Sequence, residues 1–197
     1  MRVPCIAIDP DLDIGGRDDW RSEIASDYPE LFELPRGLPE CGKGWKYLIW
    51  RVCREIRDAL DADQGDVLRI VKIKQRYGVL NIFWDGTLSA VARIAVERAI
   101  ESAFVESAQK CEVCGFPGRL YTCEGWLQTG CTGHGRGKLE RSKRRLDNTV
   151  RVVCGTIAGK PQILSCRQYD SKYDCFVDVS ADSWALEVEE ILSQCRA

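Results

Sequence analysis

The sequence predicts an α+β fold. A helix, a β-hairpin and a second helix lead into a cysteine-rich knuckle, and a small antiparallel three-stranded meander and a C-terminal helix follow. Three observations support this. Apolar residues recur at spacings of three and four over 44–60, as in an amphipathic helix. β-Branched residues interspersed with charge fill 66–84, as in a hairpin. Cysteines and the single histidine form two spaced pairs within 111–134.

The helix predicted over 44–60 has a continuous apolar stripe. Charged side chains fall largely off the stripe, and the sequence DADQGD ends the helix. The stripe should therefore face the core. Its members are Trp45, Leu48, Ile49, Val52, Ile56 and Leu60.

The hairpin over 66–84 contains two strand-like runs, VLRIVKIK and VLNIFW, with Gly78 between them. Asp85 and Gly86 supply a turn after the second run. A second long helix is predicted over 87–109, where many alanines suit close packing on the sheet. The residues expected on or near its packed face are Leu88, Val91, Ile94, Ala95, Ala99 and Ala103.

The C-terminal part contains three short strand-like runs within 150–180, namely VRVVCGTI, QILSCRQY and CFVDVS. A final helix is predicted over about 182–194. The chain is accordingly expected to divide into three parts. These are a core with its knuckle over 1–135, a basic connector over 136–149, and the meander with its helix over 150–197.

The central segment predicts one structural zinc site. Cys111 and Cys114 form a C-x-x-C pair, and Gly115 allows the tight turn that such a pair needs. After sixteen intervening residues, Cys131 and His134 form the second pair. Together they offer three thiolates and one imidazole, a tetrahedral set typical of structural zinc. Catalytic zinc would need an open position and a nearby base, and the chain has no second histidine.

Cys123 leaves one alternative open. A site made of Cys111, Cys114, Cys123 and Cys131 would release His134. Two pairs of equal spacing make a more regular clamp, which favours His134 and leaves Cys123 as a buried thiol.

A basic run directly after the knuckle, GRGKLERSKRRLDNTVR, carries seven basic and two acidic side chains. It could bind phosphates or an acidic partner, although a solvated linker is the simpler interpretation, because no aromatic platform accompanies it. The candidate contact residues are Arg136, Lys138, Arg141, Lys143, Arg144 and Arg145.

The composition narrows the class of protein. A formal net charge of −2 excludes a polycation that would seek nucleic acid by bulk electrostatics. No apolar run approaches the roughly 18 residues of a membrane span, and the N-terminus lacks a signal peptide's apolar core, so a cytoplasmic protein without membrane contacts is expected. Asp9, Asp11 and Asp13 begin like a calcium loop, but Ile14 and Trp20 break that pattern.

Four blocks within residues 28–134 resemble a known family. They are YPELF, CGKGWKYLI, VKIKQRYGVLNIFW, and CEVCGFPG with GWLQTGCTGH. They occur in the order found in an uncharacterised bacterial family that is also present in phages and prophages. CGKGWKYLI is similar to that family's C-G-D-G-W, and VKIKQRYGVLNIFW to its V-K-E-K-F-G-G-L-R-F-Y. The last block is similar to its C-E-x-C-G-x-P-G and G-W-x-x-T-x-C-x-x-H. The resemblance implies zinc at the same four ligands. Cys123 departs from the family pattern, and Val79 replaces a favoured second glycine.

Three functions are compatible with these features. The leading hypothesis is a non-enzymatic protein-binding module, such as an inhibitor or immunity-type protein of a phage or of inter-bacterial conflict, because catalytic motifs are missing and the acidic segment 1–44 could complement a basic partner. The second is a nucleic-acid-binding regulator that uses the knuckle and the basic run. The third is a hydrolase with dispersed carboxylates. Partner identity and oligomeric state stay open.

Overall fold

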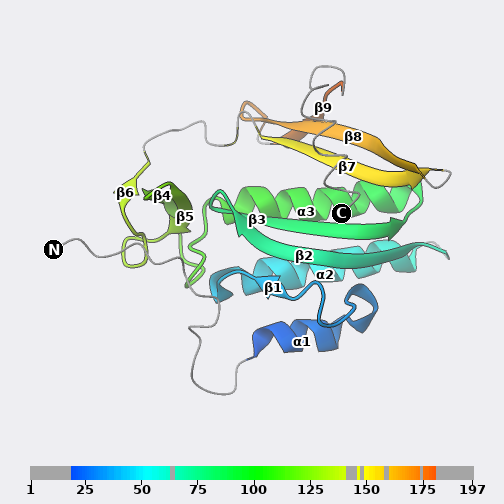
Figure 1. Ribbon diagram of the computed structural model, residues 1–197, viewed down its shortest axis with the longest axis horizontal. Helices are drawn as coiled ribbons and strands as arrows, with labels where there is room; N and C mark the ends of the chain where they lie inside the picture. Colours follow the sequence, from blue (N-terminus) through cyan, green and yellow to red (C-terminus); the bar gives the residue numbers. More distant parts are fainter. Residues whose placement is uncertain are drawn as a thin grey trace. The chain divides into compact units, whose positions relative to one another are not determined.

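The computed structural model describes residues 19–62, 65–140, 146, 149–157, 160–173 and 175–180. The chain divides into two compact units, Met1–Glu140 and Arg141–Ala197, and each is described by itself. Within the described ranges the structure contains three α-helices and three three-stranded sheets (Figure 1), which confirms the α+β class.

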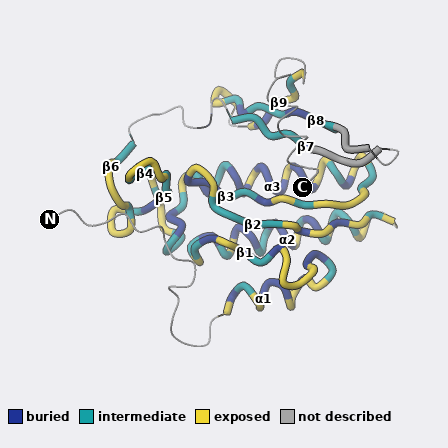
Figure 2. Tube along the Cα trace, viewed as in Figure 1, coloured by how far each residue is buried: buried dark blue, intermediate teal, exposed yellow. Residues whose placement is uncertain are grey.

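Helix α2, Lys46–Asp61, follows a short 3-10 turn, η2, at Lys43–Trp45. The predicted stripe is largely confirmed: Trp45, Ile49, Val52 and Ile56 are fully buried. The stripe packs into one hydrophobic core with α3 and the sheet, and buried positions recur along both helices (Figure 2). Burial of this apolar face is the main source of stability for such a helix.

Helix α3, Ala90–Ser107, begins at Ser89, whose hydroxyl accepts a hydrogen bond from the Ala92 N–H at 3.3 Å. The predicted packed face is partly wrong. Val91 and Ile94 are 79% and 58% exposed. The helix is apolar on several sides, so periodicity alone does not fix which side is buried. The buried hydrophobic side is formed by Ala92, Val96, Ala99, Ile100, Ala103 and Phe104.

The core sheet has the strand order β1-β2-β3. Strand β1 is Pro39–Glu40 and runs parallel to β2, Val67–Arg76, which forms an antiparallel hairpin with β3, Val79–Thr87. The hairpin register shifts between Ile70 and Lys72, which marks a β-bulge at the residue between them. In Figure 1, α2 and α3 lie behind these strands.

The N-terminal described segment adds helix α1, Trp20–Asp27, and the 3-10 turn η1, Pro29–Leu31. Trp20 and Leu31 are buried in the same core, and the Arg57 guanidinium lies 4.8 Å from the centroid of the Tyr28 ring. Tyr28, Leu31 and Phe32 of YPELF, the first resemblance block, therefore belong to the hydrophobic core.

The knuckle has a small sheet of its own, in the order β5-β4-β6. Strand β4 is Arg119–Cys123, β5 is Trp126–Gly130 and β6 is Lys138–Leu139. No residue of β4 or β6 is buried. Hydrophobic packing within this sheet is therefore too small to hold it together unaided.

The second unit contains an antiparallel sheet in the order β7-β8-β9. The strands are Val150–Ile157, Lys160–Asp170 and Cys175–Asp178. Tyr169 and Phe176 pack edge to face with ring centroids 5.6 Å apart. The helix predicted over about 182–194 lies outside the described residues.

The bulge in β2 allows a matched stability test. Ile73 is fully buried, so we expect Ile73→Ala to lower the free energy of unfolding by about 2–5 kcal/mol through lost transfer energy and a cavity. Val71, two positions earlier, is 46% exposed, and Val71→Ala should stay within about 0.5 kcal/mol. Urea denaturation followed by tryptophan fluorescence measures both, and equal losses would contradict the register.

Candidate metal centre

Four potential ligand atoms converge at one point of the knuckle. The sulfurs of Cys111, Cys114 and Cys131 and a ring nitrogen of His134 all lie within 4.8 Å of one another. The Cys114 and Cys131 sulfurs are 3.8 Å apart. The His134 Nδ1 lies 3.7 Å from the Cys111 sulfur and 3.2 Å from the Cys131 sulfur. The structure thus brings together the four residues that the sequence selected.

These separations fit a tetrahedral site for one ion. Zinc–sulfur and zinc–nitrogen bonds of about 2.3 and 2.0 Å place tetrahedral ligand atoms about 3.5–3.8 Å apart. The separations of 3.8 and 3.7 Å lie in that range and the 3.2 Å separation lies below it, and no two of the four atoms are more than 4.8 Å apart. The donor set of three sulfurs and one nitrogen suits soft or borderline metals rather than calcium or magnesium. The residues present therefore fit a transition-metal ion.

Each ligand pair lies in a tight backbone turn. In the first turn the Gly115 N–H donates to the Cys111 carbonyl at 2.8 Å, and Gly115 has a φ of +77°. That left-handed conformation favours glycine and confirms the expected reason for its presence. In the second turn the N–H groups of His134 and Gly135 both donate to the Cys131 carbonyl, at 3.1 and 2.7 Å.

The thiols of the site differ in acidity. Desolvation raises the pKa of Cys131, but hydrogen bonds from the N–H groups of Gly133 and His134 outweigh it and bring the pKa down to about 7. Desolvation, together with the neighbouring thiols of Cys111 and Cys131, raises the pKa of Cys114 to about 11. Since a metal binds thiolates, metal binding must displace protons from this site.

The metal loop is held to the core by the CGKGW segment. The Gly44 N–H donates to the Glu112 carbonyl at 2.8 Å, and the indole N–H of Trp45 donates to the Lys110 carbonyl at 2.9 Å. A side chain at position 44 would have its Cβ closer than 3.0 Å to the Cys111 carbonyl and the Gly115 nitrogen. Glycine is therefore required because two backbones meet here.

A buried carboxyl group completes the contact. Glu112 is 5% exposed, and one of its side-chain oxygens accepts the Gly42 N–H at 3.2 Å. Burial raises the pKa of Glu112 to about 7, partly offset by that hydrogen bond. The Glu112 N–H donates to the Thr129 carbonyl at 2.9 Å, so this residue joins the metal turn to both the CGKGW segment and β5.

The turn of the β2–β3 hairpin holds the knuckle from another side. The Thr129 hydroxyl, fully buried, donates to the Gly78 carbonyl at 2.5 Å. The side-chain amide of Gln75 donates to the Leu127 carbonyl. Three of the four resemblance blocks therefore meet at the metal turn: CGKGWKYLI, the hairpin and the paired ligands.

Cys123 does not join the metal cluster. It is disulfide-bonded, which differs from the buried free thiol expected from the sequence, and its sulfur is not grouped with the four ligands. The geometry therefore favours His134 over Cys123 as the fourth ligand. Trp126, at the start of β5, is 66% exposed.

The basic run is only partly described. Arg136 is exposed, and Lys138 is exposed on β6 opposite Thr122 of β4. The other candidate contacts lie outside the described residues: Arg141, Lys143, Arg144 and Arg145. The acidic triplet Asp9, Asp11 and Asp13 also lies outside them.

The contact between the CGKGW segment and the metal turn was missed by residue-level reasoning. The signal was present, because two glycines separated by one residue before a tryptophan indicate close backbone approach. What they approach lies about seventy residues further along the chain, and no local pattern reveals it.

No protein-family model, curated protein or solved structure matches this chain. Among the described residues, no helix is long and apolar enough to cross a membrane.

The close approach at Gly44 predicts a coupled loss of stability and metal affinity. Gly44→Ala should lower the free energy of unfolding by about 1–3 kcal/mol, because its Cβ would overlap the metal turn. It should also weaken metal binding in competition with a chromophoric chelator. Val91→Ala is the control, since this side chain is 79% exposed on α3 and is not part of the metal turn. Unchanged metal affinity in Gly44→Ala would contradict the coupling.

Proposed function

We propose that this chain is a non-enzymatic, zinc-stabilised protein-binding module. The observation that supports it is the set of four protein ligand atoms within 4.8 Å of one another, formed by Cys111, Cys114, Cys131 and His134. Four protein ligands fill a tetrahedral shell and leave no open position for substrate or activated water. The zinc is thus assigned a structural role, in which it crosslinks the Cys111–Cys114 turn to the Cys131–His134 turn.

The position of the cluster supports a folding role as well. Cys111 is fully buried, and its turn is hydrogen-bonded to the CGKGW segment. The strands beside it bury few residues of their own. A metal that crosslinks this segment replaces the hydrophobic core that it lacks.

The resemblance of residues 28–134 to the uncharacterised bacterial and phage family supports a more specific form of the proposed protein-binding function. We propose an inhibitor or immunity-type protein of a phage, a prophage or an inter-bacterial conflict system. Each of the four blocks contributes fully buried residues, for example Leu31, Trp45, Ile73 and Cys111. The blocks are therefore assigned to folding, and binding is assigned to exposed residues outside them or on their outer face.

Zinc content tests the metal assignment. The purified wild type should contain about one zinc per chain by elemental analysis, and Cys114→Ser should lose most of it because a tetrahedral site needs all four ligands. Cys175→Ser changes an exposed free cysteine of the second unit and should keep its zinc. Chelation of the wild type should lower its melting temperature by several degrees. Full zinc content in Cys114→Ser would overturn the assignment.

Purification from the organism that encodes the chain tests the binding function. The tagged full chain should co-purify with a protein in stoichiometric amount, and nuclease treatment should leave that complex intact. A complex that dissolves on nuclease treatment would instead favour the nucleic-acid-binding alternative. Repeated recovery of the chain alone would contradict both.

A further inference from the structure

The β2–β3 hairpin has one covered face and one open face. Leu68, Ile70 and Ile73 are buried against the helices. On the opposite side Val71 is 46% exposed and Phe83 is 41% exposed. Large apolar side chains exposed together on a sheet indicate an interaction surface more often than isolated ones do.

The bulge in β2 enlarges this open face. Regular alternation would place one residue between two buried ones, yet Ile70 and Ile73 are both buried with two residues between them. The register shift at this point turns both Val71 and Lys72 toward solvent. A bulge that redirects side chains is frequent beside functional sites, and here it places an apolar and a basic group side by side.

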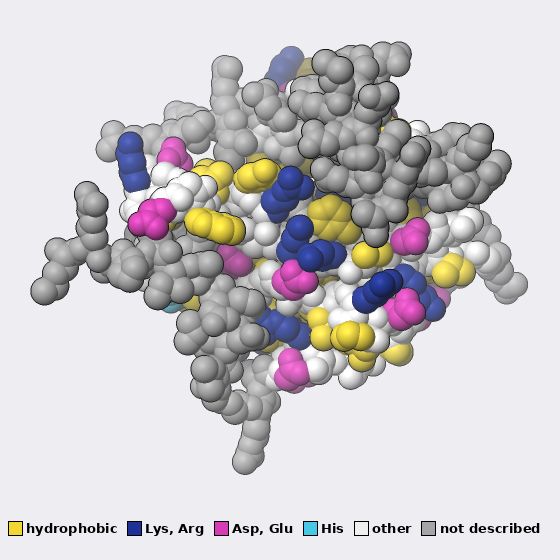
Figure 3. Space-filling model, in the orientation of Figure 1, with side chains coloured by type: hydrophobic (Ala, Val, Ile, Leu, Met, Phe, Trp, Pro, Cys, Tyr) yellow, Lys and Arg dark blue, Asp and Glu magenta, His cyan; other side chains and the backbone are white. Residues whose placement is uncertain are grey.

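The open face is rich in positive charge. Basic and apolar side chains, with some acidic ones among them, are interspersed over the part of this face that Figure 3 shows in colour. Arg69, Lys72 and Lys74 lie on β2. Arg69 pairs across the strands with Asp85 and donates to the Glu30 backbone carbonyl, and Lys72 forms an ion pair with Glu40. The ion pair between Lys72 and Glu40, at 3.4 Å, is solvent-exposed and contributes little stability, so a partner could replace it.

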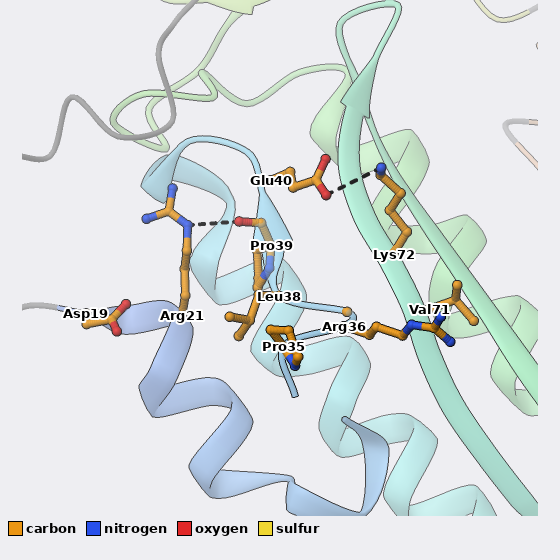
Figure 4. Close-up of a pocket in the computed structure, with 10 residues that line it drawn as sticks. Asp19, Arg21, Pro35, Arg36, Leu38, Pro39, Glu40, Val71 and Lys72 are labelled. Atoms are coloured by element: carbon orange, nitrogen blue, oxygen red, sulfur yellow. Dashed lines mark hydrogen bonds and ion pairs between the residues drawn. The ribbon is translucent and has the colours of Figure 1, made fainter. Parts of the chain in front are cut away.

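A pocket of about 540 Å³ opens beside the bulge. Its walls come from the start of α1, the 35–40 segment and β2 (Figure 4). Val71 and Lys72 belong to both the pocket and the open face, and Arg36 lies at the pocket next to Val71. The Arg36 side chain has no ion-pair or hydrogen-bond partner among the described residues. Its guanidinium is therefore available for bidentate contact with a carboxylate.

The aromatic rings on and beside this surface favour a protein over a nucleic acid. The Lys74 ammonium lies 5.6 Å from the centroid of the Phe83 ring, and the Arg76 guanidinium lies 5.1 Å from that of Tyr77. Cations of the chain itself thus lie over the ring faces that bases would need for stacking. Val71 offers no stacking surface, but it suits an aliphatic side chain of a protein.

We propose that the open face of β2–β3 and the adjoining pocket dock an acidic segment of a partner protein, with carboxylates at Arg36 and Lys72 and an apolar side chain between Val71 and Phe83. This rests on the proposed protein-binding function and names its surface. The partner segment is therefore acidic, whereas the acidic residues 1–44 led to the expectation of a basic partner.

Display of random 16-residue peptides on phage tests the surface and does not require the partner to be identified first. Selection on the full chain should enrich peptides that combine acidic and apolar residues. A synthetic copy of an enriched peptide should bind at least about tenfold more weakly to Arg36→Glu/Lys72→Glu. Arg98→Glu, an exposed change of the same charge on α3, should leave affinity within about twofold. Thermal melts check that each variant is folded. If Arg36→Glu/Lys72→Glu does not fold, Arg36→Gln/Lys72→Gln is used in its place.

The outcomes separate this proposal from the function on which it rests. If enriched peptides bind the double variant as tightly as the wild type, the assigned surface is wrong, but the protein-binding function is not contradicted. Enrichment without acidic bias, or no enrichment at all, would overturn the docking of an acidic segment. A fluorescent 20-nucleotide single strand or 20-base-pair duplex that binds with the same dependence on Arg36 and Lys72 would reassign the surface to nucleic acid.

Discussion

The structure of the first unit depends on one close contact, the meeting of the Gly44 backbone with the turn that begins at Cys111. On one side of the contact, Trp45 leads directly into α2 and the hydrophobic core. On the other side, the same turn presents two metal ligands. The hydrogen bond between the Gly44 N–H and the Glu112 carbonyl therefore links hydrophobic packing to metal coordination. The segment at Gly44 and the turn at Cys111 are separated by about seventy residues, so contacts within either segment cannot bring the two together.

The metal and the core have complementary tasks. The core is built from α2, α3 and one face of the β2–β3 hairpin, where large side chains such as Ile49 and Ile73 are fully buried. The knuckle has no comparable cluster. Its interior polar contacts, such as the Thr129 hydroxyl on the Gly78 carbonyl, fix orientation but supply modest net stability. A bound ion would add the missing free energy locally, as small metal-dependent modules require.

Sequence reasoning located what depends on local spacing. The stripe of α2, the hairpin and the four clustered ligands each follow from a period or a motif in one short segment. It failed where the outcome depends on distant partners. The buried side of α3 is set by α2 and β3, and an apolar helix with Val91 and Ile94 beside Val96 offers more than one acceptable side. The bulge at Val71 follows from the need to bury both Ile70 and Ile73, which no strict alternation predicts.

The same bulge separates residues that maintain the fold from residues free to bind. Ile70 and Ile73 are buried and fixed, so a change there acts on stability. Val71 and Lys72, between them, contribute little to the core and are held in position by a strand that is buried on its other face. A rigid strand that presents adjustable residues allows the surface to change partner while the fold stays the same. Buried motif residues such as Ile73 should therefore report on folding, and differences in recognition should concentrate at the exposed motif residues of the bulge and the open face, such as Val71 and Phe83.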